Sequence, residues 1–168
     1  MTKRAVVMLV ALALVLPAAV WAQGKTNFSA TWIFDPAKSD PPAGGRRGGG
    51  GGGGAGGVPG GGIDAALSTL YIKQSATELT IQGDATYKLD GSEGVNRLPN
   101  GEVKTKASWD GAKLVVTSTQ SVSMPAGRFD IQMKDVWSLD AGLLTIERTT
   151  TTPQGSNTRK LLYNKKSS

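Results

Sequence analysis

Two side chains near the end of the chain have the chemistry to hold a small anionic group. Arg159 can match a carboxylate with two parallel hydrogen bonds, and Tyr163 can donate its hydroxyl. In an extended strand they share one face but stand about 13 Å apart, at about 3.3 Å per residue. This spacing excludes a joint clamp on one carboxylate. Arg159 is the stronger candidate, since a tyrosine in a final strand is as often a core residue with its hydroxyl in water.

The other candidates also have structural interpretations. Arg159 can instead stack over Trp32 and close one end of a β-barrel, and we favour this role. Trp109 and Trp137 are favoured as packing anchors, because a small barrel needs its few large side chains for stability. Asp135 interrupts the apolar parity of its segment, which indicates either a bulge or an interior polar contact. The tentative ligand-binding set is Arg159, Tyr163, Trp109, Trp137 and Asp135, and the barrel-closing set is Trp32 and Arg159.

The chain contains no histidine and no cysteine. This composition excludes Ser–His–Asp and Cys–His catalysis, zinc held by His or Cys, and disulfides. Residue counts leave paired-carboxylate chemistry open, but most acidic residues stand at turns such as Asp90, Asp110 and Asp140, where Asx-turn chemistry explains them. We therefore predict a protein that is not an enzyme, with no catalytic residue, bound metal or cofactor.

The positive charge of the chain does not indicate a nucleic-acid partner. The formal net charge is +6, but Lys3 and Arg4 lie at the N-terminus and Arg46 and Arg47 lie in a glycine tract. Elsewhere both signs alternate along the chain, whereas a nucleic-acid binder concentrates its positive charge on one face.

Residues 1–22 have the layout of an export signal. Lys3-Arg4 precede the apolar run Ala5–Leu16, Pro17 ends the run, and Val20-Trp21-Ala22 place small residues before a cleavage site after Ala22. The run is shorter than the roughly 20 residues that span a bilayer, and no second apolar stretch follows. We expect a periplasmic or secreted protein with no transmembrane segment after cleavage.

Residues 23–168 are predicted to form one β-barrel domain, interrupted by a flexible glycine-rich loop at residues 40–64. From Gly44 to Gly62, 14 of 19 residues are glycine. Glycine loses the most backbone entropy on ordering and has no side chain to bury, so this tract is expected to be disordered.

The rest of the chain reads as short extended segments separated by turn signals such as Asn100-Gly101 and Asp110-Gly111. The pattern predicts an all-β fold, an antiparallel up-and-down meander of about 8–9 strands closed into a small lipocalin-like barrel, which hides every strand edge. The expected strands are 27–35, 70–74, 78–82, 85–89, 103–109, 113–121, 128–139, 143–151 and 159–164.

Three segments resemble fatty-acid-binding proteins and, more loosely, lipocalins. Asn27–Trp32 is similar to an F-x-G-T-W opening, Ser108–Gly111 to a W-D-G turn, and Thr158–Lys165 to a T-R-x-Y-x-K final strand. The resemblance implies a calycin-type barrel around an apolar or amphipathic ligand. Ala30 replaces a family glycine, and the glycine tract stands where the family has a helical lid. These differences and the export signal point to an exported, bacterial-type barrel that shares the plan without belonging to the family.

Two functions follow from these observations. The first is an exported, monomeric lipocalin-like protein that binds a small apolar or amphipathic ligand without catalysis. The second is an envelope or secreted interaction module whose barrel is filled by its own side chains and takes no small-molecule ligand. An interior cavity of roughly 300 Å³ or more would favour the first.

Overall fold

The computed structural model describes residues 25–41, 68–83, 85–98, 101–124 and 127–167. The predicted signal peptide with its cleavage site, and all of the predicted glycine-rich loop beyond Pro41, lie outside the described residues. The secondary structure in the described ranges is entirely β, and no helix there is long and apolar enough to cross a membrane.

Ten strands make up the described chain. They alternate buried and exposed residues, as expected for strands with one face on a core. Their bounds are β1 Ala30–Phe34, β2 Thr69–Gln74, β3 Glu78–Ile81, β4 Ala85–Lys88, β5 Glu93–Leu98, β6 Gly101–Asp110, β7 Lys113–Met124, β8 Gly127–Asp140, β9 Leu143–Thr152 and β10 Gly155–Lys165.

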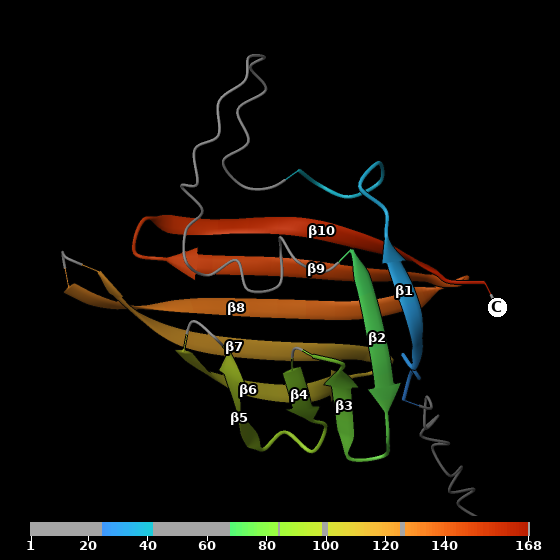
Figure 1. The fold of residues 1–168 in the computed structure, drawn as a ribbon, viewed down its shortest axis with the longest axis horizontal. Coiled ribbons are helices and arrows are strands. Elements are labelled where there is room, and N and C mark those ends of the chain that lie inside the picture. The colour runs from blue at the N-terminus through green and yellow to red at the C-terminus, as the bar shows by residue number, and fades with distance from the viewer. Residues whose placement is uncertain (1–24, 42–67, 84, 99–100, 125–126, 168) are drawn as a thin grey trace, which may run out of the picture.

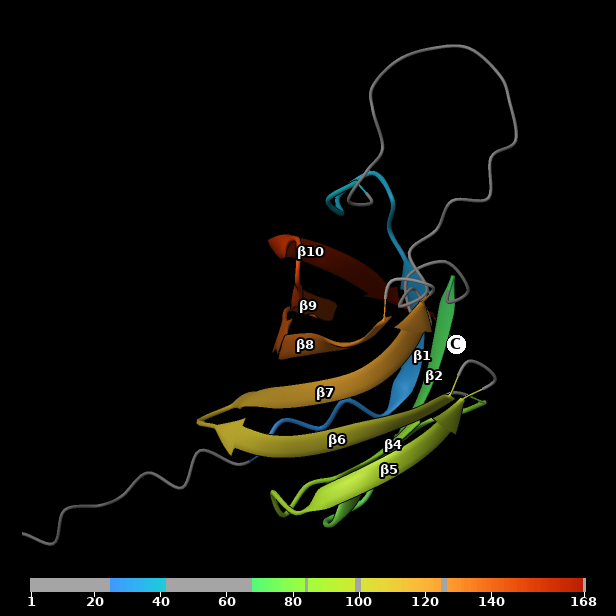
Figure 2. The ribbon, with the colours of Figure 1, turned by 90° about the vertical axis from the view of Figure 1, so that its left-hand side faces the viewer.

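The strands form one antiparallel sheet in the order β4-β3-β2-β1-β10-β9-β8-β7-β6-β5. The first strand therefore pairs with the last, with Trp32 opposite Lys165 and Phe34 opposite Tyr163. Short strands β1–β4 form one wall and cross the long strands β6–β10 of the other wall, and the sheet curls into a nearly closed barrel (Figures 1 and 2). The predicted all-β meander is confirmed.

Two details of the prediction are wrong. The structure has ten strands, because β5 was not expected, and the barrel is not completely closed, because β4 and β5 are the two ends of the sheet. β5 was not predicted because it lacks a pattern of alternating apolar residues, since Gly94 is on its inward face. A Cβ atom at Gly94 would lie 3.2 Å from Thr105 Oγ1, so the close approach of β5 and β6 favours glycine there.

The apolar core fills one end of the barrel. Phe28 and Trp32 are almost completely buried, and Phe28 lies edge-on to Trp137 with ring centroids 5.8 Å apart and stacks on Trp109 at 6.2 Å. Tyr87 packs edge-on against Trp137 at 6.3 Å. Burying such large side chains is the main stabilising contribution in a barrel without disulfides.

The segment before β1 closes this end of the barrel. Gln74 on β2 accepts a hydrogen bond from the Phe28 N–H at 2.9 Å and donates one to the Thr26 carbonyl at 2.9 Å. Trp32 Nε1 donates to the Phe28 carbonyl at 2.9 Å. Phe28 is thereby fixed as a plug in the end of the barrel.

The segment after β1 extends the contact between the two ends of the chain. The Asp35 N–H donates to the Leu162 carbonyl at 2.8 Å, and Ser39 Oγ accepts the Leu162 N–H at 2.9 Å. The Asp40 N–H donates to the Lys160 carbonyl at 2.8 Å, and the Asp40 carboxylate accepts the Lys160 N–H at 2.7 Å. Residues 35–40 therefore follow β10 beyond the end of β1.

Candidate functional site

Three charged residues lie in one row across the inner face of β8, β9 and β10. Asp135 is opposite Arg148, and Arg148 is opposite Arg159 in the register of these strands. All three are buried. We call Asp135, Arg148 and Arg159 the interior charged row.

Asp135 and Arg148 form a two-pronged ion pair. Arg148 Nε donates to Asp135 Oδ1 at 2.8 Å and Arg148 Nη2 donates to Asp135 Oδ2 at 2.6 Å. This parallel geometry is the strongest arrangement of a guanidinium and a carboxylate, and it offsets the cost of removing both charges from water. Asp135 thus makes the interior polar contact that was one of its two predicted roles.

Arg159 brings a second guanidinium to the row. Its Nη2 donates to the main-chain carbonyl of Asp40 at 3.1 Å, which ties the segment after β1 to the barrel wall. The row therefore contains two guanidinium groups and one carboxylate. Guanidinium groups in a buried position form strong, charge-assisted hydrogen bonds with anionic groups.

Further polar groups are buried on the inner faces of β6, β7 and β8. Thr105 Oγ1 on β6 and Trp137 Nε1 on β8 are buried and have no hydrogen-bond partner among the described residues. Buried polar atoms of this kind normally find a partner, so each is an available group for a bound molecule or water. Two more polar residues, Ser118 and Gln120, are buried on β7.

The structure does not bring Arg159 and Trp32 together. Lys165 is the cross-strand partner of Trp32, and it lies six residues from Arg159 along β10, a path of about 20 Å. Trp32 belongs to the aromatic end of the barrel, whereas Arg159 contacts the segment after β1. Each residue helps to hold the barrel together, but at different places.

The remaining predicted site residues belong to the core. Tyr163 is buried, and its ring lies 5.4 Å from that of Phe34. Trp109 and Trp137 both pack on Phe28, and the ammonium of Lys25 lies 5.9 Å from the Trp109 ring centroid. Of the predicted ligand-binding set, only Asp135 and Arg159 lie in the interior charged row.

Arg148 is the site residue that the sequence analysis missed. It shares the inward parity of Leu144 and Ile146, just as Asp135 shares the parity of Trp137. Two opposite charges that each interrupt an apolar face, on segments joined by a tight turn, are a signal for an interior ion pair. This signal was present in the sequence.

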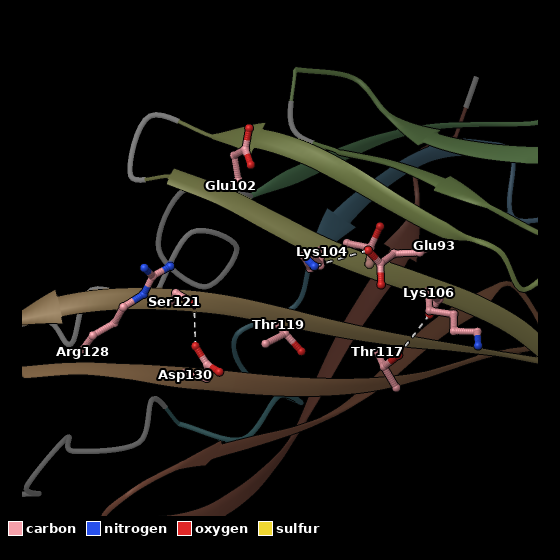
Figure 3. Close-up of a pocket in the computed structure, with 10 residues that line it drawn as sticks. Glu93, Glu102, Lys104, Lys106, Thr117, Thr119, Ser121, Arg128 and Asp130 are labelled. Atoms are coloured by element: carbon pink, nitrogen blue, oxygen red, sulfur yellow. Dashed lines mark hydrogen bonds and ion pairs between the residues drawn. The ribbon is translucent and has the colours of Figure 1, made fainter.

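An outer groove of about 670 Å³ crosses β5 to β8 on the face away from the core (Figure 3). Lys104 pairs with Glu93 at 3.6 Å, and Ser121 hydrogen-bonds to Asp130. The charged side chains are of both signs and largely exposed, so the groove has little net charge. Its lining is Glu93, Glu102, Lys104, Thr105, Lys106, Thr117, Thr119, Ser121, Arg128 and Asp130.

A smaller seam cavity of about 370 Å³ lies where β4 faces β5. It is lined by Thr80, Ile81, Gly83, Ala85, Thr86, Val95, Asn96 and Arg97. Neither of these two cavities is the interior cavity that would favour ligand binding. No cluster of acidic side chains in the described ranges could hold a metal ion.

The geometry defines the class of the fold. A meander of ten antiparallel strands whose first strand pairs with its last is a nearly closed up-and-down β-barrel. No protein-family model matches the chain, and a search of curated proteins finds no match. Among solved structures, the chain is similar to a secretary abundant heat soluble (SAHS) protein from Ramazzottius varieornatus, with 22% identity, a TM-score of 0.39, and coverage of 58% of this chain and 70% of that chain.

Proposed function

We propose that this protein binds a small amphipathic ligand inside the barrel, without catalysis, and that Arg159 contacts an anionic head group. The carrying observation is the interior charged row, in which the buried guanidinium of Arg159 lies next to the Arg148–Asp135 ion pair on the inner face of the barrel. A carboxylate or similar anion at Arg159 would receive charge-assisted hydrogen bonds in a place shielded from water.

The surroundings of the row suit the two halves of such a ligand. Thr105 Oγ1 on the inner face of β6 is a further buried polar atom that can hydrogen-bond a polar group of the ligand. On β8 the inward-facing Ile131 and Phe129 continue from Asp135 away from the aromatic end, and they offer apolar surface to a short chain. The aromatic end itself is filled by Phe28 and Trp137.

We further propose that the protein acts outside the cytoplasm as a monomer. The support for export is the three-part leader at residues 1–22. N-terminal sequencing of the exported protein should begin at Gln23, and light scattering should give the mass of one chain.

Native mass spectrometry of the mature protein, purified from the exported fraction without detergent, tests ligand binding. We expect a bound mass of a few hundred daltons that is lost on denaturation. Titration with a fluorescent fatty-acid analogue, dansylundecanoate, should show affinity reduced about tenfold or more by Arg159→Met. Arg128→Met, which removes an outward-facing guanidinium, should leave the affinity unchanged. A bare polypeptide mass together with no retention of the probe would contradict the proposal.

The second candidate is an interaction module without a small-molecule ligand. The filled aromatic end and the outer groove of about 670 Å³ favour it. Two results together would favour the interaction module. The first is that the protein does not retain the probe. The second is that the double variant Lys106→Glu with Arg128→Glu, which changes two residues of the groove, no longer captures a partner from the exported fraction.

A further inference from the structure

Within the described strands, the wall of the barrel has one place where no backbone ladder joins neighbouring strands. β4 and β5 are the two ends of the sheet and face one another. Side chains bridge them instead. Asn96 Oδ1 accepts the Thr86 N–H at 2.9 Å, and Asn96 Nδ2 donates to the Thr86 carbonyl at 3.1 Å. Near the connecting turn, Lys88 Nζ also donates to the Glu93 carbonyl at 3.1 Å.

The seam cavity reaches from the outer face to the core. Its lining includes outward-facing residues such as Thr86 and the half-exposed Val95. It also includes Ile81 and Ala85, which are buried members of the hydrophobic core. A molecule in this cavity would therefore touch solvent-facing and interior side chains at once.

The seam is the weakest part of the wall. Parting β4 from β5 breaks the two Asn96 hydrogen bonds and the exposed Lys88 contact. Parting β8 from β9 would break a ladder from Gln132 to Asp140. Local openings occur where few buried contacts and few backbone hydrogen bonds must be lost.

The aromatic end offers no easier route. Phe28 is fully buried there, and Gln74 holds the segment with two hydrogen bonds. Passage through this end would require the Phe28 plug to leave its contacts with Trp109 and Trp137.

We infer that the β4–β5 seam is a lateral portal through which an amphipathic ligand enters the barrel, and that Asn96 is its latch. The inference of a ligand rests on the proposed function, whereas the opening of the seam does not. The two can therefore be tested separately.

Thiol labelling tests the opening. The chain has no cysteine, so Ala85→Cys places the only thiol at the seam and Ala107→Cys places one on the inner face of β6, away from the seam cavity. Both positions are buried. We expect the thiol of Ala85→Cys to be labelled faster than the thiol of Ala107→Cys. Adding Asn96→Ala should raise the labelling rate of Ala85→Cys at least fivefold and leave the labelling rate of Ala107→Cys unchanged. Equal acceleration of both thiols, or of neither, would overturn the portal.

Amide exchange gives the same answer without a cysteine. The Thr86 N–H is held by the Asn96 side chain, so Asn96→Ala should remove its protection. The Ile81 and Leu79 amides should keep their rates. If a cysteine variant does not fold, this exchange pattern decides, and unchanged Thr86 protection would overturn the latch.

Stopped-flow kinetics with dansylundecanoate test the entry of a ligand. Asn96→Ala should raise the association and dissociation rates by a similar factor and leave Kd nearly unchanged, because the latch is outside the interior charged row. Unchanged rates, despite faster labelling of Ala85→Cys, would overturn entry through the seam. Failure of the wild-type protein to bind the probe would instead count against the proposed function, and the labelling result would stand.

Discussion

At the scale of single residues, the ion pair of Asp135 and Arg148 links β8 to β9 on the inner face of the barrel. The position of Asp135 on an apolar face indicated an interior contact, and the structure confirms it. Its partner was not predicted, because parity along one strand does not give the register with the next. The predicted stacking of Arg159 on Trp32 failed to find support for the same reason, since the register separates them by six residues of β10.

The burial of the Asp135–Arg148 ion pair predicts how much stability is lost when one charge is removed. Asp135→Asn removes the charge that compensates the Arg148 guanidinium, so we expect the free energy of unfolding to fall by about 3 kcal/mol. Urea denaturation measures this change. Asp130→Asn, on the outer face of the same strand, is the matched control and should cost less than about 0.5 kcal/mol. Replacing the pair together, by Asp135→Leu with Arg148→Met, should restore most of the loss. Equal effects of the two single changes would refute this energetic role.

At the scale of elements, turns were more predictable than strand ends. Turns at Asp110 and at Asp140 were predicted, and at each position two strands are joined through a two-residue turn. β10 begins at Gly155, four residues before the predicted start at Arg159, because Ser156 and Thr158 carry no apolar signal. Their hydroxyls instead pair with Thr151 and Thr149 on β9. Hydrogen bonds between hydroxyl side chains of this kind leave no pattern of alternating apolar residues from which a strand could be predicted.

One of these turns carries backbone strain. Ala141 and Gly142 have φ of 45° and 82°, and Ala141 is the one non-glycine residue with positive φ in the described ranges. Asparagine tolerates this left-handed conformation better than alanine. Ala141→Asn should therefore stabilise the protein by about 0.5–1 kcal/mol and raise Tm by about 3 °C. Ala112→Asn, in the other two-residue turn, should give no gain, because only Gly111 has positive φ there. A similar rise in Tm for both variants would show that the backbone conformation is not the cause.

At the scale of the whole molecule, the meander and its closure into a barrel could be predicted from the sequence, but the place where the sheet stays open could not. Hairpins follow from neighbouring segments, and closing a meander into a barrel requires its first strand, β1, to pair with its last, β10. The gap between β4 and β5 depends on the curvature of the complete sheet. Asn96, which bridges that gap, reads in the sequence only as a polar residue before Pro99.

The free energy of unfolding should depend on pH through Asp35, which lies where β1 pairs with β10. Asp35 accepts a hydrogen bond from Asn164 Nδ2 at 2.9 Å and pairs with Lys38 at 3.2 Å. The hydrogen bond from Asn164, followed by that from Lys38, lowers the pKa of the Asp35 carboxyl below its usual range. The folded state therefore binds this proton less readily than the unfolded chain. The stabilising contribution of the Asp35 carboxylate is complete above about pH 4 and is lost as the pH falls through the lowered pKa.

Asp35→Asn should consequently be less stable than the wild type near neutral pH, and the difference should narrow below about pH 4. Urea midpoints measured across the acid range give this comparison. Asn164→Ala is the matched control, because it removes the main cause of the shift and should return the NMR-measured pKa of Asp35 toward its usual range. Parallel stability profiles for the wild type and Asp35→Asn would mean that the carboxylate does not contribute to closing the barrel. In that case the backbone pairing of the segment after β1 with β10 would hold the first and last strands together without it.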